Sequence, residues 1–175
     1  PEVRGGATTG GYGGFMDNAF GVAYDSARQL AYVTGSDSDS IAVVDVSDPD
    51  DPEVLNGYVH GTQLDGARGV AYDSARQLAY VAARENSGSL AVVDVTYPNS
   101  PVVSGSISDP IMEGAFGVAY DSARQLAYVT GTFSYALAVV DVSNKTNPEV
   151  RGSVSDGVYM DRARGVAYDS ARQLA

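Results

Sequence analysis

The eleven residues GVAYDSARQLA occur four times without change, and the copies start at Gly21, Gly69, Gly117 and Gly165, always 48 residues apart. A second block follows each of the first three copies: IAVVDV from Ile41, LAVVDV from Leu90 and LAVVDV from Leu137. Copies differ in length only between the blocks, in short segments typical of loops, where insertions cost little free energy. A repeat of this length indicates that one supersecondary unit is stacked several times.

Each repeat predicts four short β-strands. In the first repeat these are residues 21–24, 30–34, 41–46 and 53–56, which are rich in β-branched and aromatic residues and are separated by polar turns. Residues 26–31 could also start a helix of about two turns, but so short a helix is marginal in water and we expect no helix there. Four strands in a repeat of about 48 residues predict an all-β fold, a β-propeller with four-stranded blades. A β-solenoid is the alternative.

The chain does not begin and end at blade boundaries. We expect a single propeller arc over 1–175, because residues 1–5 match residues 148–152, a fourth strand, while Ala175 falls within a second strand. The expected parts are 1–20 as the final strand of a preceding blade plus a loop, 21–68 as blade 1, 69–116 as blade 2, 117–164 as blade 3 and 165–175 as the start of blade 4. Such a partial ring has open strand edges, so we expect further blades or self-association to close it.

The residue before each GVAY alternates between phenylalanine and arginine. The residues after the second strand alternate as well, as Thr34-Gly35, Ala82-Ala83 and Thr130-Gly131. This pattern indicates a duplicated two-blade unit and an even number of blades, of which eight is preferred. The alternating residues are Phe20, Arg68, Phe116 and Arg164.

The starts GVA, the second strands LAYV and the third strands LAVVDVS with their prolines resemble the LVIVD repeat family of β-propellers, and more distantly YVTN-type propeller repeats. The resemblance covers nearly the whole chain and implies the fold. It implies little about activity, because these repeats are found mostly in bacterial and archaeal surface or secreted proteins of unassigned function. We therefore expect a secreted or cell-surface protein.

Composition excludes several classes of function. The chain has no cysteine and a single histidine, His60, so it has no thiolate nucleophile and no repeated histidine metal centre. Its formal net charge of -11 repels phosphate backbones, so no nucleic acid is expected as a partner. No apolar run approaches the roughly 18 to 20 residues of a membrane span, so no membrane insertion is expected.

The ligand face of a propeller surrounds the mouth of its central channel. There we expect the loop before each first strand, called the leading loop below, and the loop between strands two and three. An apolar-acidic pair recurs in the leading loops, and its acids could hold Ca²⁺ or a polyhydroxyl ligand, or could cap their own turns or pair with arginine. These acids are Asp17, Asp65, Glu113 and Asp161. Other candidates for this face are Phe20, Arg68, Phe116, Arg164, Asp37, Asp39, Arg84, Glu85, Phe133 and Tyr135.

Other repeated residues have a structural interpretation. Asp45, Asp94 and Asp141 end the third strands and are expected to bond to the adjoining turn. The repeated tyrosines are expected to pack between blades with satisfied hydroxyl groups. They are Tyr24, Tyr72, Tyr120 and Tyr168.

The function predicted from these observations is a non-enzymatic binding or assembly scaffold, with no catalytic residue and no cofactor apart from a possible calcium ion. A calcium-dependent or glycan-binding lectin is the first alternative. A glycoside hydrolase is the second, but it needs two acids in different environments, whereas acids at equivalent repeat positions share one. The expected partners are a protein or glycan ligand and further blades.

Overall fold

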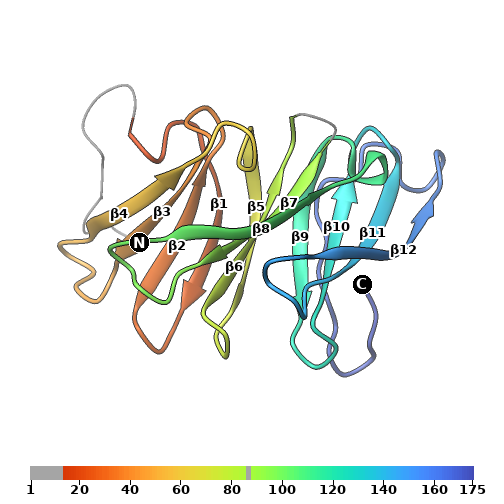
Figure 1. The fold of residues 1–175 in the computed structure, drawn as a ribbon. Coiled ribbons are helices and arrows are strands. Elements are labelled where there is room, and N and C mark those ends of the chain that lie inside the picture. Colours follow the sequence, from red (N-terminus) through yellow and green to blue (C-terminus); the bar gives the residue numbers. More distant parts are fainter. Residues whose placement is uncertain (1–13, 86–87) are drawn as a thin grey trace.

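The computed structural model describes residues 14–85 and 88–175 and forms three separate four-stranded antiparallel sheets (Figure 1). In each sheet the strands pair in chain order. The first sheet contains β1 (Ala19–Asp25), β2 (Leu30–Gly35), β3 (Ser40–Asp45) and β4 (Glu53–Val59). The second contains β5 (Ala67–Asp73), β6 (Leu78–Ala83), β7 (Ser89–Asp94) and β8 (Val102–Ser108). The third contains β9 (Ala115–Asp121), β10 (Leu126–Gly131), β11 (Ala136–Asp141) and β12 (Glu149–Ser155).

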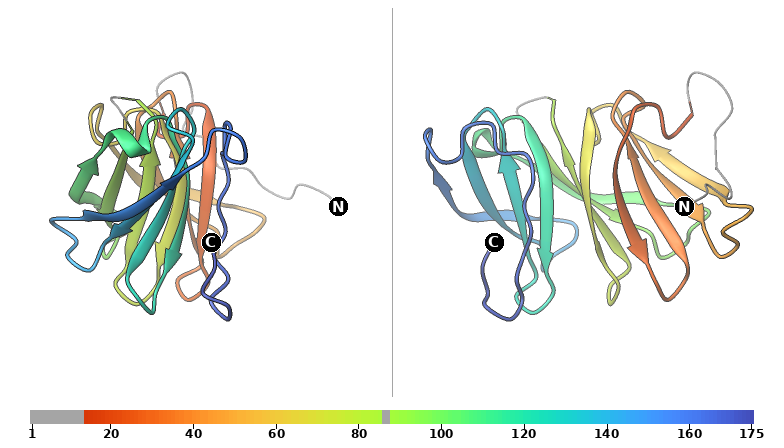
Figure 2. Two further views of the ribbon diagram at one scale, coloured as in Figure 1. Left: turned by 90° about the vertical axis from the view of Figure 1, so that its right-hand side faces the viewer. Right: turned by 180° about the vertical axis from the view of Figure 1, so that it is seen from behind.

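The sheets stand side by side along an arc, with the first strands β1, β5 and β9 adjacent to one another (Figure 2). This arrangement confirms the all-β propeller prediction, because a solenoid would form continuous sheets rather than three separate ones. A short 3-10 turn, η1 (Pro110–Met112), precedes β9. After β12 the backbone of Asp169 pairs with that of Leu174 in a single bridge. The strand expected at residues 1–5 lies outside the described residues.

The middle sheet is buried on both faces, which explains its continuous apolar strands. Along β7 the side chains alternate, so that Leu90 and Val92 pack toward the third sheet while Ala91 and Val93 pack toward the first. All four are fully buried. Burying a Leu or Val side chain contributes roughly 1.5–3 kcal/mol, so these layers between blades supply the main stabilisation of the arc.

The segment that could have been a helix is a tight turn. Asp25 Oδ1 accepts hydrogen bonds from the backbone N–H groups of Ala27 (3.0 Å) and Arg28 (3.2 Å). Gln29 then adopts a left-handed conformation with φ 54°, which stops any helix and directs the chain into β2. The equivalent glutamines of the other copies, Gln77, Gln125 and Gln173, have the same left-handed φ.

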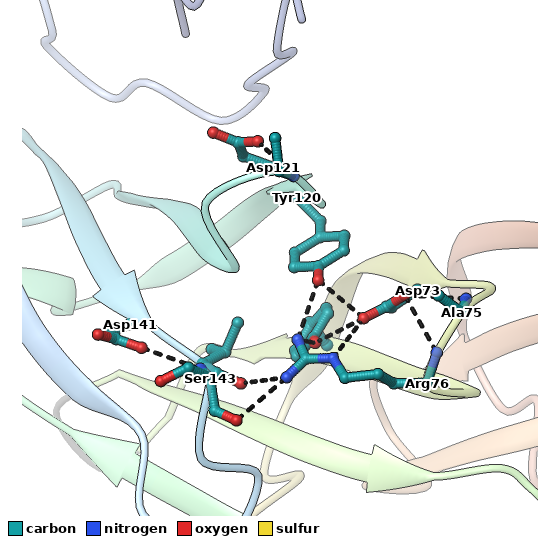
Figure 3. A network of polar contacts seen from close by, with 10 residues as sticks. Asp73, Ala75, Arg76, Tyr120, Asp121, Asp141 and Ser143 are labelled. Carbon is teal, nitrogen blue, oxygen red and sulfur yellow. Dashed lines mark hydrogen bonds and ion pairs between the residues drawn. The ribbon is translucent and has the colours of Figure 1, made fainter.

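An ion pair between an arginine and a buried aspartate lies at each junction between neighbouring blades, and Figure 3 shows the one between the second and third blades. Between the second and third blades, Arg76 Nε lies 2.7 Å from Asp73 Oδ2, and Arg76 donates to the Tyr120 hydroxyl (2.9 Å) and to the Val142 carbonyl (2.9 Å). Its Nη2 also donates to the Tyr80 hydroxyl (2.5 Å). The pair therefore bonds both to its own blade and to the next one, and few polar atoms of either side chain are left unpaired.

The same junction recurs between the first and second blades. Arg28 lies 2.6 Å from Asp25 Oδ2 and donates to the Tyr72 hydroxyl (2.9 Å) and the Val95 carbonyl (3.0 Å). Tyr32 completes it as Tyr80 does in the next junction. The third copy repeats the pattern with Asp121, Arg124, Tyr128 and Tyr168.

Candidate functional site at the channel mouth

The alternating phenylalanines and arginines form a stack across the blades. The Arg68 guanidinium lies 4.6 Å from the Phe20 ring centroid and 5.0 Å from that of Phe116. The two rings meet edge to face, with centroids 4.9 Å apart. Arg164 lies over the Phe116 ring at 5.3 Å. Since cation–π contacts hold these groups together, the alternation seen in the sequence is one physical assembly.

The second alternation, of Thr with Ala, supports the first. Thr34 Oγ1 accepts from the Gly21 N–H (2.9 Å) and donates to the Arg68 carbonyl. In the same way Thr130 Oγ1 accepts from Gly117 N–H (2.9 Å) and donates to the Arg164 carbonyl (3.2 Å). Each threonine of a phenylalanine blade thus holds the backbone of the arginine in the next blade. Ala82 occupies the equivalent position in the arginine blade.

The inner strands approach so closely at this end that three glycines are required. A Cβ at Gly21 would lie 2.3 Å from the Arg68 carbonyl oxygen, and one at Gly117 would lie 2.4 Å from that of Arg164. Both distances are shorter than any real contact. A Cβ at Gly69 would likewise lie 2.6 Å from the Phe116 carbonyl oxygen, so packing of main chain against main chain explains the glycine that begins each of the first three copies.

The loops between strands two and three add further side chains to the mouth. Arg84 lies over the Phe133 ring at 5.1 Å, and Phe133 and Tyr135 are about half exposed. Together with the stack they border a cavity of about 340 Å³. Its lining residues are Phe20, Arg68, Arg84, Phe116, Thr132, Phe133, Tyr135, Arg162 and Arg164.

Seven of these nine lining residues are among those that the sequence placed on the ligand face. Thr132 and Arg162 were not expected there. Arg162 has a left-handed backbone (φ 53°), as do Asn18, Gly66 and Gly114 at the equivalent position of the other leading loops. An arginine at a position otherwise occupied by glycine or asparagine was the available signal, because a long side chain is strained in this conformation.

The leading-loop acids serve the fold through their backbone. The carbonyls of Asp17, Asp65 and Glu113 accept from the N–H groups of the loops between strands two and three, at Asp37 (3.2 Å), Glu85 (3.2 Å) and Phe133 (3.0 Å). Beside them, Leu64 and Met112 are fully buried, as expected for core residues. The repeated apolar-acidic pair therefore anchors one loop to the other.

The acids do not gather into a metal site in the part of the chain that the structure describes. Across residues 14–85 and 88–175 no three His, Asp or Glu side chains, Asp17, Asp65, Glu113 and Asp161 included, lie close enough together to hold a metal ion. Asp37 and Asp39 are not in the cavity lining. Asp37 accepts from Asn18 Nδ2 (3.0 Å), and Asp39 accepts from the Gly66 N–H (2.9 Å).

Acids elsewhere cap turns, as expected. The side chains of Asp45, Asp94 and Asp141 each accept a hydrogen bond from the backbone N–H two residues later, at 2.8 to 2.9 Å. Hydrogen bonds from the side chains of Ser47 and Ser143, and then from their backbone N–H groups, lower the pKa of Asp45 and Asp141.

Positive charge dominates the cavity, although the chain as a whole has a net charge of -11. Among the described residues Arg68, Arg162 and Arg164 make no ion pair, and Arg84 has only a 3.5 Å contact with the exposed Glu85. Arg68 Nε is buried and has no hydrogen-bond partner. Burial lowers the pKa of Arg68, and the charges of Arg84 and Arg164 lower it further, while those of Glu85 and Asp37 oppose them. The cavity therefore presents three guanidinium groups that form no ion pair with the described residues.

Comparison with known proteins supports the architecture. A model of the LVIVD repeat matches residues 77–109 and 126–156, which contain strands β6 to β8 and β10 to β12. No curated protein matches the chain in sequence. Within the described ranges, no helix has the length and apolar character needed to cross a membrane.

Solved structures with the same fold are larger than this chain. Hydrazine synthase from Kuenenia stuttgartiensis aligns with 95% of this chain and 43% of its own, at 16% identity and a TM-score of 0.70. A functionally unknown protein from Desulfotomaculum acetoxidans aligns over 86% and 45%, at 16% identity and a TM-score of 0.65. A periplasmic gluconolactonase from Pseudomonas aeruginosa aligns over 77% and 40%, at 14% identity and a TM-score of 0.64. The chain thus spans less than half the length of these three proteins, and identities this low establish the fold alone.

Proposed function

Because the chain carries LVIVD repeats on a β-propeller fold, we propose that it is a non-enzymatic binding propeller, secreted or at the cell surface, whose recognition surface is the channel mouth. The observation that carries this proposal is the cavity of about 340 Å³ lined by residues from all three blades. Its volume lies within the range of small-molecule sites, and its lining combines aromatic rings with a few polar groups. Such a lining can hold a ligand without changing it chemically.

The groups around the cavity favour binding over catalysis. They are guanidinium groups, aromatic rings and one threonine hydroxyl, whereas general acid–base catalysis uses groups that exchange protons near neutral pH. Arginine stays protonated throughout that range. Two acids in unlike environments would favour a hydrolase, but Asp37 and Asp39 bond to the protein's own loops.

A fragment screen by protein-observed NMR tests the proposal. The library should contain neutral, cationic and anionic fragments, sugars and CaCl₂, and ligands should be recovered and identified afterwards. We expect shifts centred on Phe133 and Tyr135, loss of these hits in a Phe133→Ala/Tyr135→Ala variant, and recovery of unchanged ligand. A Tyr97→Ala variant is the control, because Tyr97 is exposed on an outer loop. Catalytic turnover of glucono-δ-lactone or of an aryl glycoside would overturn the non-enzymatic assignment.

We also propose that β1 receives a further blade of the same kind. Val22 and Tyr24 on β1 are exposed (67% and 55%), whereas the equivalent Tyr72 lies inside a junction with Asp25 and Arg28. A blade whose first two strands are joined by an Asp-Ser-Ala-Arg turn would complete this junction. Light scattering on the purified chain tests whether a second copy supplies this blade: a defined dimer supports closure by a second copy, and a stable monomer would contradict closure by a second copy.

A further inference from the structure

The cavity at the channel mouth has a chemical preference that its shape alone does not explain. Four of the ten arginines line it, and three of these four make no ion pair within the described residues. Elsewhere in the structure, arginine is neutralised: Arg28, Arg76 and Arg124 are each paired with a buried aspartate. The mouth therefore uses arginine differently from the junctions.

Arg68 is the clearest case. Its guanidinium is held by stacking on Phe20 and Phe116. The buried Nε has no hydrogen-bond partner among the described residues. An N–H group in this situation is normally satisfied by an acceptor from a ligand or water, and the planar guanidinium fork matches carboxylate and phosphate groups.

The surroundings limit the size of the anion. The net charge of -11 repels large polyanions at a distance, and Asp37 and Glu85 lie near the guanidinium of Arg68. A small ligand can enter a cavity of about 340 Å³ without approaching most of this negative surface. The exposed faces of Phe133 and Tyr135 favour a ligand with an apolar or planar body beside the charged group.

We propose that the channel mouth binds a small organic anion, with its carboxylate or phosphate on Arg68, Arg84 and Arg164 and its apolar body against Phe133 and Tyr135. This inference rests on the proposed function, since it takes the mouth as the recognition surface and names the ligand class. Arg162 stands at the rim and adds charge toward the same cavity.

Isothermal titration calorimetry with three matched probes tests the inference. Phenyl phosphate and benzoate carry a ring and an anionic group, whereas benzyl alcohol carries the ring alone. We expect either anion to bind at least about tenfold more tightly than benzyl alcohol, and the difference to shrink as NaCl is raised. Arg68→Gln should weaken anion binding about tenfold or more. Arg151→Gln, at an exposed arginine on β12, should have no effect.

Because the Arg68 guanidinium contacts two rings, its loss could disturb the stack, so Arg164→Gln provides a second variant at an exposed position that contacts one ring. Anion binding that persists unchanged in both variants would overturn the inference. Equal affinity for benzyl alcohol would also overturn it, but would leave the proposed function intact, since the mouth would then bind neutral ligands. If none of the three probes binds, the inference fails, and the fragment screen decides the proposed function separately.

Discussion

The Tyr120 hydroxyl donates a 2.7 Å hydrogen bond to Asp73 Oδ2 across the junction between the second and third blades. The same hydroxyl accepts a hydrogen bond from Arg76 (Figure 3). Tyr120 belongs to one copy of the repeat, whereas Asp73 and Arg76 belong to the copy before it. Tyr72 makes the equivalent bond to Asp25 at 2.8 Å. The invariant sequence Tyr-Asp-Ser-Ala-Arg therefore supplies both sides of each junction: its tyrosine bonds to the preceding blade, and its aspartate and arginine bond to the following one.

Tyr120→Phe removes the hydrogen bonds of this hydroxyl without changing the packing of the ring. We expect the free energy of unfolding to fall by about 1.5–3 kcal/mol, because a buried hydrogen bond to a charged group is lost. Tyr24→Phe is the matched control, since the Tyr24 side chain is largely exposed on β1 and should change stability by less than about 0.5 kcal/mol. Urea unfolding measures both. Equal losses would show that the junction hydrogen bond contributes nothing.

Acid should weaken the junctions. Burial alone would raise the pKa of Asp73, but hydrogen bonds from Arg76 and Tyr120 outweigh it and leave this pKa lowered in the folded protein. The same balance lowers the pKa of Asp25. In the unfolded chain an aspartate has a pKa of about 3.9. The stabilisation is therefore fully present above about pH 4 and is lost as the pH falls through the lowered folded value.

Urea unfolding between pH 2 and pH 7 measures this effect. Asp73→Asn should be less stable at pH 7, by roughly 3 kcal/mol, because Arg76 is left without its partner. Its stability should also change less with pH below 4 than that of the unaltered chain. Parallel pH profiles for the two proteins would contradict the assignment to Asp73.

Gln77→Gly should stabilise the chain. Gln77 has φ 54°, a left-handed conformation that costs a side-chain-bearing residue roughly 1–2 kcal/mol, and part of this is offset by the greater entropy of glycine when unfolded. We expect a net gain of about 0.5–1 kcal/mol in thermal or urea unfolding. Ser74 in the same turn does not have a left-handed φ, so Ser74→Gly relieves no strain and should lower the stability. If both substitutions act in the same direction, the explanation fails.

Thr34→Val tests the link between the two alternations at the channel mouth. The valine keeps the shape but leaves the Gly21 N–H and the Arg68 carbonyl without the buried hydroxyl, which should cost about 1–3 kcal/mol. Thr34→Ser retains the hydroxyl and should recover most of the loss. Calorimetry with phenyl phosphate should show weaker binding in Thr34→Val than in Thr34→Ser, because Arg68 is less firmly held.

Arg162→Gly should separate stability from binding. Glycine adopts the left-handed conformation of this position (φ 53°) without the strain that arginine has there. The free energy of unfolding should therefore stay the same or rise by up to about 1 kcal/mol. It also removes one cation from the cavity lining, so phenyl phosphate should bind more weakly, and the difference should vanish at high salt. Unchanged affinity at low salt would exclude Arg162 from the site.

Strand ends were the least accurate part of the sequence-based prediction. The first strand was expected at residues 21–24, but β1 begins at Ala19 because the pairing with β2 is irregular between Ala19 and Val22 and extends beyond that irregularity. The fourth strand was expected at residues 53–56, yet β4 continues to Val59 because it pairs along the full length of β3. Strand ends depend on the length and register of the neighbouring strand, so they cannot be predicted from the local β-propensity of the sequence.

The sequence by itself determined the period, the four strands of each blade and most of the residues at the channel mouth, because repetition places equivalent residues at equivalent positions on every blade. Tertiary structure decided what those residues do. The conformation of the loop between β2 and β3 turns the carboxylates of Asp37 and Asp39 toward the leading loops, while Arg68 is held over Phe20 and Phe116. Such choices depend on backbone angles and on contacts between residues about 48 apart, so only the folded arc reveals a cavity lined with arginine.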